Sequence, residues 1–356
     1  MWLRRRGAQS LPCSDCARRG LWRSIPVCSA ELTATAETVD HLCRRYGFPT
    51  RHARLTPTVR GANGRIWRLD TTDTRYAVKE LFWEHDVRPE AIPHEVAFRN
   101  ATVRNGVRSP ASIPNVDGSY LTRLGNVLVR LYTWVDGHPI TTPSNAASWV
   151  GRTLAQMHVL HYPATGPHDH WFDRCPSSQE WRQLARDATT AQAVWAPQLA
   201  QALPLVDELS ILVTPVATDE LITCHLDLHP SNVLLNDNQE LVLLDWDNTG
   251  NGSAERELAS ALMAWHVHNG RPNDAAVLAT VKAYRAAGGQ ASITGTHSFG
   301  THLATSLNYI HVWADTIRAS SASAEHLDFA NRQVTQGLNR LPTPQLLTSL
   351  AELAGR

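Results

Sequence analysis

The feature that most constrains the fold of this chain is a change in its hydrophobic pattern at residues 136–139, Asp-Gly-His-Pro. Before this break, residues 56–132 carry short apolar runs separated by turn signals, a pattern that predicts β-strands. After it, residues 145–354 carry apolar side chains at helical spacing. One helix at 92–105 interrupts the strands, and one strand-rich insert at 221–246 interrupts the helices. We therefore expect an α+β fold with a small antiparallel β-rich N-terminal lobe, a larger helical C-terminal lobe and a ligand cleft between them.

The same pattern divides the 356 residues into three parts. Residues 30–134 are expected to form the N-terminal lobe, and residues 135–356 the C-terminal lobe. Residues 1–29 contain clustered arginines but no apolar periodicity, so we expect them to form a mobile N-terminal extension.

The formal net charge of zero gives no reason to expect binding to nucleic acid or to an anionic membrane surface. No apolar run approaches the roughly 18 residues that a membrane span needs. The charge is unevenly distributed, because residues 1–136 carry +8 and residues 137–356 carry −8. A basic first part suits a polyphosphate, whereas an acidic second part suits metal ions or a cationic substrate.

The six cysteines show no regular spacing that would indicate a disulfide framework. Cys13 and Cys16 form a single Cys-x-x-Cys without the further ligands of a zinc site. We therefore expect a cytoplasmic protein in a reducing compartment. Nothing in the sequence indicates an obligate protein partner.

The strand-rich insert carries the polar residues with the clearest chemical meaning. Asp227 and Asn232 lie five residues apart in a proline-containing loop, and Asp245 ends the apolar run that follows. Two short strands on either side of the turn at 236–239 would bring Asn232 and Asp245 together. Such a small set of oxygen ligands suits Mg²⁺, which completes its coordination shell with water and phosphate oxygens.

Phosphoryl transfer requires a centre of this kind, with a metal ion to neutralise phosphate charge and a carboxylate to orient the attacking hydroxyl. It also requires a cation on the phosphates. Lys79, on a strand that reads Ala-Val-Lys-Glu, is the candidate, and Glu95 on the following helix is its expected partner.

With these residues at this spacing, the chain resembles the aminoglycoside phosphotransferase and choline-kinase-like enzymes, and in particular their antibiotic-kinase branch. The pattern His-x-Asp-x-His-x-x-Asn, followed by an apolar strand ending in Asp, is present at residues 225–245. The resemblance covers roughly residues 30–320. It implies a two-lobed protein-kinase-like fold, Mg²⁺ as the cofactor and ATP or GTP as the phosphate donor.

The resemblance also implies roles for individual residues. Asp227 would position the acceptor hydroxyl and accept its proton, and Asn232 and Asp245 would hold Mg²⁺. Lys79 would contact the α- and β-phosphates, and Glu95 would pair with Lys79.

Further nucleotide contacts are implied on a hinge at 133–135 and on a loop covering the phosphates: Thr133, Val135, Gly61, Asn63 and Gly64. His225 would brace the catalytic loop by hydrogen bonds, and Asp247 would support the metal site. Glu257 stands where the family often has an Asp one turn into the next helix.

We expect a small-molecule O-phosphotransferase that inactivates an antibiotic of the aminoglycoside, basic peptide or nucleoside type. The sequence lacks the Asp-Phe-Gly and Ala-Pro-Glu elements of protein kinases, which argues against a protein substrate. Three alternatives stay open. They are a metabolic kinase for choline, an amino alcohol or a sugar, a nucleotide-binding regulatory pseudokinase, and a metal hydrolase built on His225 and His229.

Overall fold

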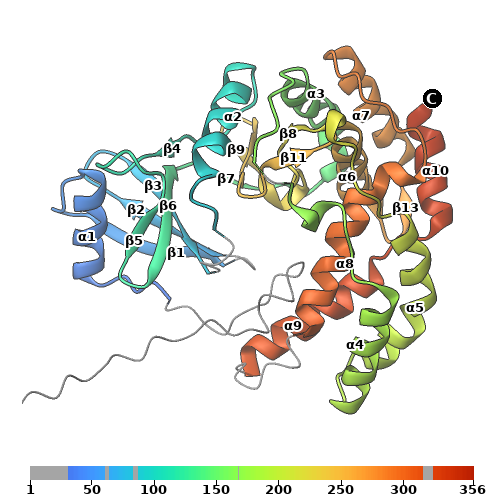
Figure 1. Cartoon of the computed structure of the whole chain (residues 1–356). Helices are drawn as coiled ribbons and strands as arrows, with labels where there is room; N and C mark the ends of the chain where they lie inside the picture. The colour runs from blue at the N-terminus through green and yellow to red at the C-terminus, as the bar shows by residue number, and fades with distance from the viewer. Residues whose placement is uncertain (1–30, 61–63, 83–86, 167, 316–323) are drawn as a thin grey trace, which may run out of the picture.

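The computed structural model describes residues 31–60, 64–82, 87–166, 168–315 and 324–356. The predicted N-terminal extension, residues 1–29, lies outside these segments, as do Gly61 and Asn63. The described residues form two lobes, one built on a sheet and one built mainly of helices (Figure 1). The predicted α+β architecture is therefore confirmed.

The N-terminal lobe is built on one antiparallel sheet. Its strands are β1 (Arg54–Arg60), β2 (Gly64–Asp70), β3 (Arg75–Leu81), β4 (Ser112–Ile113), β5 (Thr122–Leu124) and β6 (Val127–Thr133). They follow the order β1-β2-β3-β6-β4, and β5 also pairs with β6. The β3–β6 register places Lys79 opposite Arg130. Because directly opposed residues of an antiparallel pair share a face, both side chains leave the sheet on the same side.

Two helices pack beside this sheet. Helix α1 (Ala36–Tyr46) is capped at its N-terminus by the hydroxyl of Thr35. Gly47, in the left-handed conformation, caps its C-terminus. Its buried side chains join those of the strands in one apolar cluster. Helix α2 (Ile92–Arg104) lies at the boundary between the lobes (Figure 1). It coincides with the helix predicted at 92–105.

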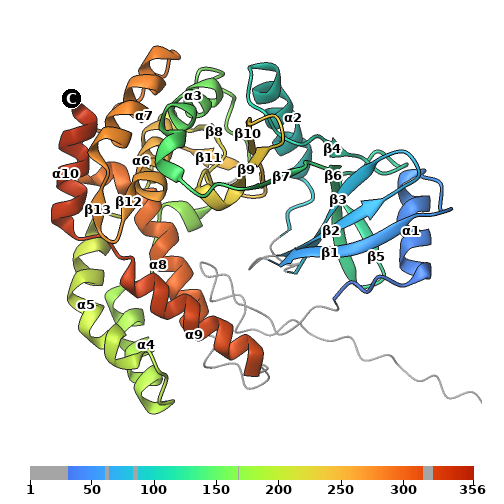
Figure 2. The same ribbon diagram turned by 180° about the vertical axis from the view of Figure 1, so that it is seen from behind.

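The C-terminal lobe contains the remaining helices. These are α3 (Ala147–His158), α4 (Ser178–Thr190), α5 (Ala196–Ile211), α6 (Ala254–His266), α7 (Asp274–Ala286), α8 (Gly300–Asp315), α9 (Ala324–Asn339) and α10 (Pro344–Gly355). Figures 1 and 2 show α3, α7 and α10 at one end of this lobe and α4 and α5 at the other. No helix in the described ranges has both the length and the apolarity needed to cross a bilayer.

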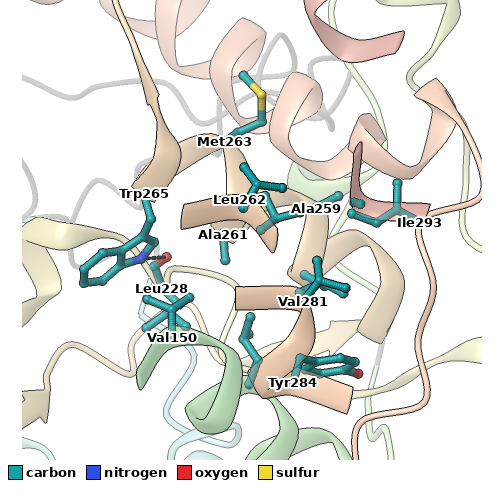
Figure 3. Close-up of a cluster of buried hydrophobic side chains, with 14 of the residues drawn as sticks. Val150, Leu228, Ala259, Ala261, Leu262, Met263, Trp265, Val281, Tyr284 and Ile293 are labelled. Atoms are coloured by element: carbon teal, nitrogen blue, oxygen red, sulfur yellow. Dashed lines mark hydrogen bonds between the residues drawn. The ribbon is translucent and has the colours of Figure 1, made fainter. Parts of the chain in front are cut away.

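The packing of α6 fixes the position of the loop that carries the predicted catalytic residues. Trp265 is fully buried, and its indole nitrogen donates a hydrogen bond of 3.0 Å to the carbonyl oxygen of Leu228 (Figure 3). Helices α3 and α7 approach closely at Gly151, where an added Cβ would lie 2.1 Å from the carbonyl oxygen of Thr280. Only glycine permits this contact.

Short strands connect the lobes and form the insert. These are β7 (Gly137–Pro139), β8 (Ile222–Cys224), β9 (Val233–Asn236), β10 (Leu241–Leu243) and β11 (Gly250–Gly252). The sequence indicated only a break at 136–139, but this segment pairs with β9. Three residues with a proline carry too little pattern for a strand to be predicted, so the partner strand decides the conformation here.

The apolar spacing after residue 177 predicts helices at 178–200 and 203–213, whereas the structure has α4 and α5 with the break at residues 191–195. Pro197 lies in the first turn of α5, where a proline costs no hydrogen bond. Pro204 lies inside α5.

Candidate active site

The β9–β10 hairpin brings Asn232 and Asp245 together, as its apolar pattern predicts. Asn232 directly precedes β9, and Asp245 lies two residues after β10. The ladder continues past the strands, because the amide of Leu244 donates to the carbonyl oxygen of Asn232 at 2.8 Å. Asp245 adopts a left-handed backbone with φ of 55°, which ends the strand in a turn.

Asp227 accepts hydrogen bonds from its neighbours on both carboxylate oxygens. The side-chain amides of Asn232 and Asn248 donate to Oδ2 at 2.9 and 3.0 Å, and His229 Nε2 lies 3.0 Å from Oδ1. Burial alone would raise the pKa of Asp227, but the hydrogen bond and charge of His229 outweigh it and lower the pKa. Asp227 is therefore ionised at neutral pH and available to accept a proton.

A second set of hydrogen bonds braces the backbone around Asp227. Leu226 has a φ of 63°, an unfavourable conformation for a residue with a Cβ. Its amide donates to Glu257 Oε1 at 2.6 Å. His225 accepts from the amide of Asp227 at Nδ1, which leaves Nε2 to donate to the carbonyl oxygen of Leu244. His225 thus makes the bracing contacts expected of it.

Lys79 reaches across from β3 to the acidic residues after β10. Its ammonium lies 2.6 Å from Asp245 Oδ1 and 2.8 Å from Asp247 Oδ2. Arg130 also binds Asp247, at 2.9 Å. Although partial burial favours the neutral carboxyl, these two cations lower the pKa of Asp247 to about 2.

The predicted pairing of Lys79 with Glu95 is not what the structure shows. Glu95 instead accepts a hydrogen bond from Arg130, and both side chains are buried. The physical reason is the β3–β6 register, which places the longer guanidinium of Arg130 beside Lys79 on the same face. Arg130 therefore connects Glu95 to Asp247, and Lys79 binds the other oxygen of Asp247.

The donors at this point fit a Mg²⁺ ion. Asn232 uses its Nδ2 group for the contacts that it makes among the described residues, which leaves its amide oxygen for a cation. Asp245 contributes a carboxylate directly after Leu244, whose amide is hydrogen-bonded to the backbone of Asn232. Hard oxygen donors, few in number, are the protein ligands that Mg²⁺ prefers.

The predicted hinge residues lie apart from this cluster. Thr133 and Val135 line a cavity of about 780 Å³ together with residues after α2 and in the β9–β10 turn. Thr133 Oγ1 accepts a hydrogen bond from the amide of Ala111 at 2.9 Å. Asp227, Asn232 and Asp245 do not line this cavity.

Gly64, predicted in the loop over the phosphates, begins β2. An added Cβ at Gly64 would lie 2.2 Å from the carbonyl oxygen of Glu80 on β3, so the close approach of these two strands requires glycine there. Gly61 and Asn63 lie outside the described residues, and the loop's role stays a prediction.

Sequence reasoning missed Arg130 and Asn248 as members of the site. Arg130 lies in an apolar strand, and a charged residue among Val and Leu is itself a signal that a buried partner is needed. Asn248 follows Asp247 directly, but its contact with Asp227 depends on the turn that follows β10.

Comparison with known proteins places the chain in a family. A sequence model described as the phosphotransferase enzyme family matches residues 54–293, which is more than half of the chain. The chain belongs to this family. Within this phosphotransferase, the matched range includes Lys79, Asp227, Asn232 and Asp245 and parts of both lobes.

Solved structures share the phosphotransferase fold at low sequence identity. A spectinomycin phosphotransferase crystallised with ADP and spectinomycin has 15% identity and a TM-score of 0.62, over 90% of this chain and 98% of that one. An amicoumacin kinase has 14% identity and a TM-score of 0.57, over 86% and 94%. A choline kinase from Cryptosporidium parvum Iowa II has 12% identity and a TM-score of 0.52, over 86% and 95%. The phosphotransferase therefore has the protein-kinase-like fold that the sequence resemblance implied.

Proposed function

We propose that this phosphotransferase is a Mg²⁺-dependent kinase that transfers the γ-phosphate of ATP or GTP to a hydroxyl of a small molecule, and that its acceptor is an antibiotic. The observation that carries the proposal is the convergence of Asp227, Asn232, Asp245 and Lys79. These residues supply a base, two metal ligands and a phosphate-binding cation at one point.

Asp227 acts on the acceptor in this mechanism. The hydroxyl binds at a carboxylate oxygen of Asp227, which orients it toward the γ-phosphate and takes its proton as the new bond forms. The donors His229, Asn232 and Asn248 hold the carboxylate in one orientation. Glu257 holds the preceding backbone, so the position of Asp227 does not depend on the acceptor.

Asn232, Asp245 and Lys79 act on the nucleotide. Asn232 and Asp245 would hold Mg²⁺, which neutralises phosphate charge when bound. Lys79 contacts the phosphates, and Asp247 keeps its ammonium close to the metal ligands. Arg130 and Glu95 complete the support by holding Asp247 in place.

Two observations support an antibiotic as the acceptor. Residues 137–356, which include the C-terminal lobe, carry a formal charge of −8, and an acidic lobe favours a cationic acceptor such as an aminoglycoside or a basic peptide. The spectinomycin and amicoumacin enzymes also superpose over most of the chain. The superposition with choline kinase supports a metabolic kinase for choline, an amino alcohol or a sugar as the second candidate.

A mass-spectrometric screen tests the proposal. The purified chain is incubated with Mg²⁺ and ATP, or Mg²⁺ and GTP, and with panels of aminoglycoside, peptide and nucleoside antibiotics, choline, amino alcohols and sugars. We expect one antibiotic class to gain the mass of a phosphoryl group. Gain by a metabolite alone would select the second candidate. Nucleotide binding without any transfer would contradict both and favour a regulatory pseudokinase.

A further inference from the structure

A cluster of metal-binding side chains lies outside the active site, in the segment between α3 and α4. His168 Nε2 lies 2.8 Å from Asp173 Oδ2, and His170 Nδ1 lies 3.1 Å from Asp173 Oδ1. One ligand atom from each residue lies within 4.8 Å of the other two. The Asp173 side chain is only 2% exposed, so its charge needs partners that remain in place.

The contact between His168 and Asp173 is close but is not aligned as a hydrogen bond. Both ring nitrogens of His168 are buried and have no hydrogen-bond partner among the described residues. Ligands of one ion point at a common centre and not at one another, which produces short contacts with poor hydrogen-bond angles. In a tetrahedral zinc site with bonds of about 2.0–2.1 Å, neighbouring ligand atoms lie about 3.3 Å apart. The 2.8 Å contact of His168 with Oδ2 of Asp173 and the 3.1 Å hydrogen bond of His170 to Oδ1 are slightly shorter than this spacing.

The two neighbouring arginines, Arg88 and Arg256, bind other groups and leave the ligand atoms of this cluster available to a metal ion. Arg88 binds Asp169, which is not a member of the cluster. Arg256 is near enough to Asp173 for the two charges to interact, but its guanidinium donates to the carbonyl oxygen and hydroxyl of Thr214. Neither arginine is hydrogen-bonded to a ligand atom of the cluster.

We propose that His168, His170 and Asp173 form a site for a divalent transition-metal ion, for which zinc is the fitting class. Two imidazole nitrogens and one carboxylate oxygen are ligands of Zn²⁺, whereas Mg²⁺ prefers oxygen donors alone. The three residues leave a fourth position for water, and the metal pairs with the buried charge of Asp173. This site is independent of the proposed kinase activity.

The bound ion would tie together two parts of the C-terminal lobe. On one side of the cluster lies Asn251 of β11, which is close in sequence to Asp247. Its side chain is hydrogen-bonded to the backbone of residues 165 and 166. On the other side, Asn308 of α8 donates to the carbonyl oxygens of Trp171 and Arg174. The ion would therefore act as a structural cross-link within residues 168–173, a segment held by β11 on one side and by α8 on the other.

Zinc stoichiometry tests the proposal. The full chain carrying Cys13→Ser and Cys16→Ser, which removes the Cys-x-x-Cys pair, and Cys224→Ser, which removes the thiol of a second cluster with His158 and Glu257, is stripped with a chelator and equilibrated with Zn²⁺. We expect about one bound zinc per chain, and at least about tenfold weaker binding in His168→Ala and His170→Ala. His41→Ala, on the exposed face of α1, is the matched control and should bind like the parent chain.

A second measurement distinguishes the loss of a zinc ligand from misfolding of the variant. His170 is the more exposed ligand, with 40% of its side chain accessible, so His170→Ala should keep the far-ultraviolet circular dichroism of the parent. Zn²⁺ should raise the thermal midpoint of the parent but not that of folded His170→Ala. Failure of the parent to bind one zinc, or equal binding by the parent and both histidine variants, would overturn the proposal.

Discussion

At the scale of single residues, the site depends on a chain of alternating charges. Glu95 binds Arg130, Arg130 binds Asp247, and Asp247 binds Lys79. Every member of this chain except Asp247 is less than one-tenth exposed. Because a buried charge is costly without its partner, the four residues should respond to substitution as a unit.

Substitution of Arg130 tests this chain. Arg130→Met leaves the buried Glu95 without its hydrogen-bonded partner, with Arg99 as the remaining nearby cation, and should lower the free energy of unfolding by about 3–5 kcal/mol. The double variant Arg130→Met with Glu95→Gln should recover part of that loss, because the unpaired charge is also removed. Denaturant unfolding of the single and double variants measures both effects.

Arg45→Met is the control for this prediction. Arg45 pairs with Asp117 at 2.7 Å, but the two side chains are 35% and 63% exposed. Loss of this exposed pair should cost less than about 1 kcal/mol. Equal losses in Arg45→Met and Arg130→Met would show that the buried chain has no special role.

At the scale of elements, the catalytic loop is positioned by helix α6. Glu257 in the first turn of α6 accepts from the amide of Leu226 and also contacts His158 Nε2 at 2.7 Å. The Glu257 carboxylate therefore holds the residue before Asp227 in its left-handed conformation. Burial opposes the charge, but the hydrogen bond and charge of His158 lower the pKa of Glu257, which stays ionised.

Glu257→Gln should separate catalysis from nucleotide binding. The amide cannot accept from Leu226 and His158 together, so Asp227 loses its fixed position, and kcat should fall by about a hundredfold. Nucleotide affinity, measured by calorimetry, should stay within about twofold, a change of under 0.5 kcal/mol.

Glu255→Gln is the matched control, because Glu255 lies on the same helix but contacts Thr294 and Ser298. It should keep the parent kcat. A kcat for Glu257→Gln equal to that of the control would contradict the positioning role.

The parts of the candidate site that depend on interactions between residues close in sequence could be predicted from the sequence. Asn232 and Asp245 are joined by a hairpin whose strands and turn are continuous in sequence, so their proximity follows from the pattern alone. The partner of Glu95 could not be predicted this way, because Arg130 lies 35 residues away and its face depends on the β3–β6 register. Most helices of the C-terminal lobe were predicted to within a few residues, but the break between α4 and α5 was placed too late, and β7 exists only through its pairing with β9.

At the scale of the whole molecule, a buried histidine joins three helices of the C-terminal lobe. His266 at the end of α6 is fully buried and lies 2.7 Å from the hydroxyl of Thr280 on α7. That hydroxyl donates to the carbonyl oxygen of Ala147 at the start of α3. Burial lowers the pKa of His266 to about 4.

This histidine should make the lobe sensitive to acid. In the unfolded chain His266 has a pKa of about 6.5, so below that pH the unfolded chain binds the additional proton and is favoured. Between pH 6.5 and 4 this single group should remove about 3 kcal/mol of stability, and above pH 6.5 it should have no effect.

Denaturant unfolding at several pH values measures this contribution. His266→Gln keeps a donor toward Thr280 but does not titrate, so its stability should fall less than that of the parent between pH 6.5 and 4. Parallel pH profiles for the two proteins would show that His266 does not carry the effect.

Replacement of Asp227 tests whether this chain is a kinase with Asp227 as its base. With the acceptor identified by the screen, turnover and nucleotide affinity are measured for Asp227→Ala and for Asp219→Ala, an exposed carboxylate outside the site. We predict that Asp227→Ala loses about a hundred- to ten-thousandfold in kcat with nucleotide affinity unchanged, and that Asp219→Ala behaves as the parent. A kcat for Asp227→Ala within about tenfold of the parent would show that Asp227 is not the base, because a missing base costs more than that.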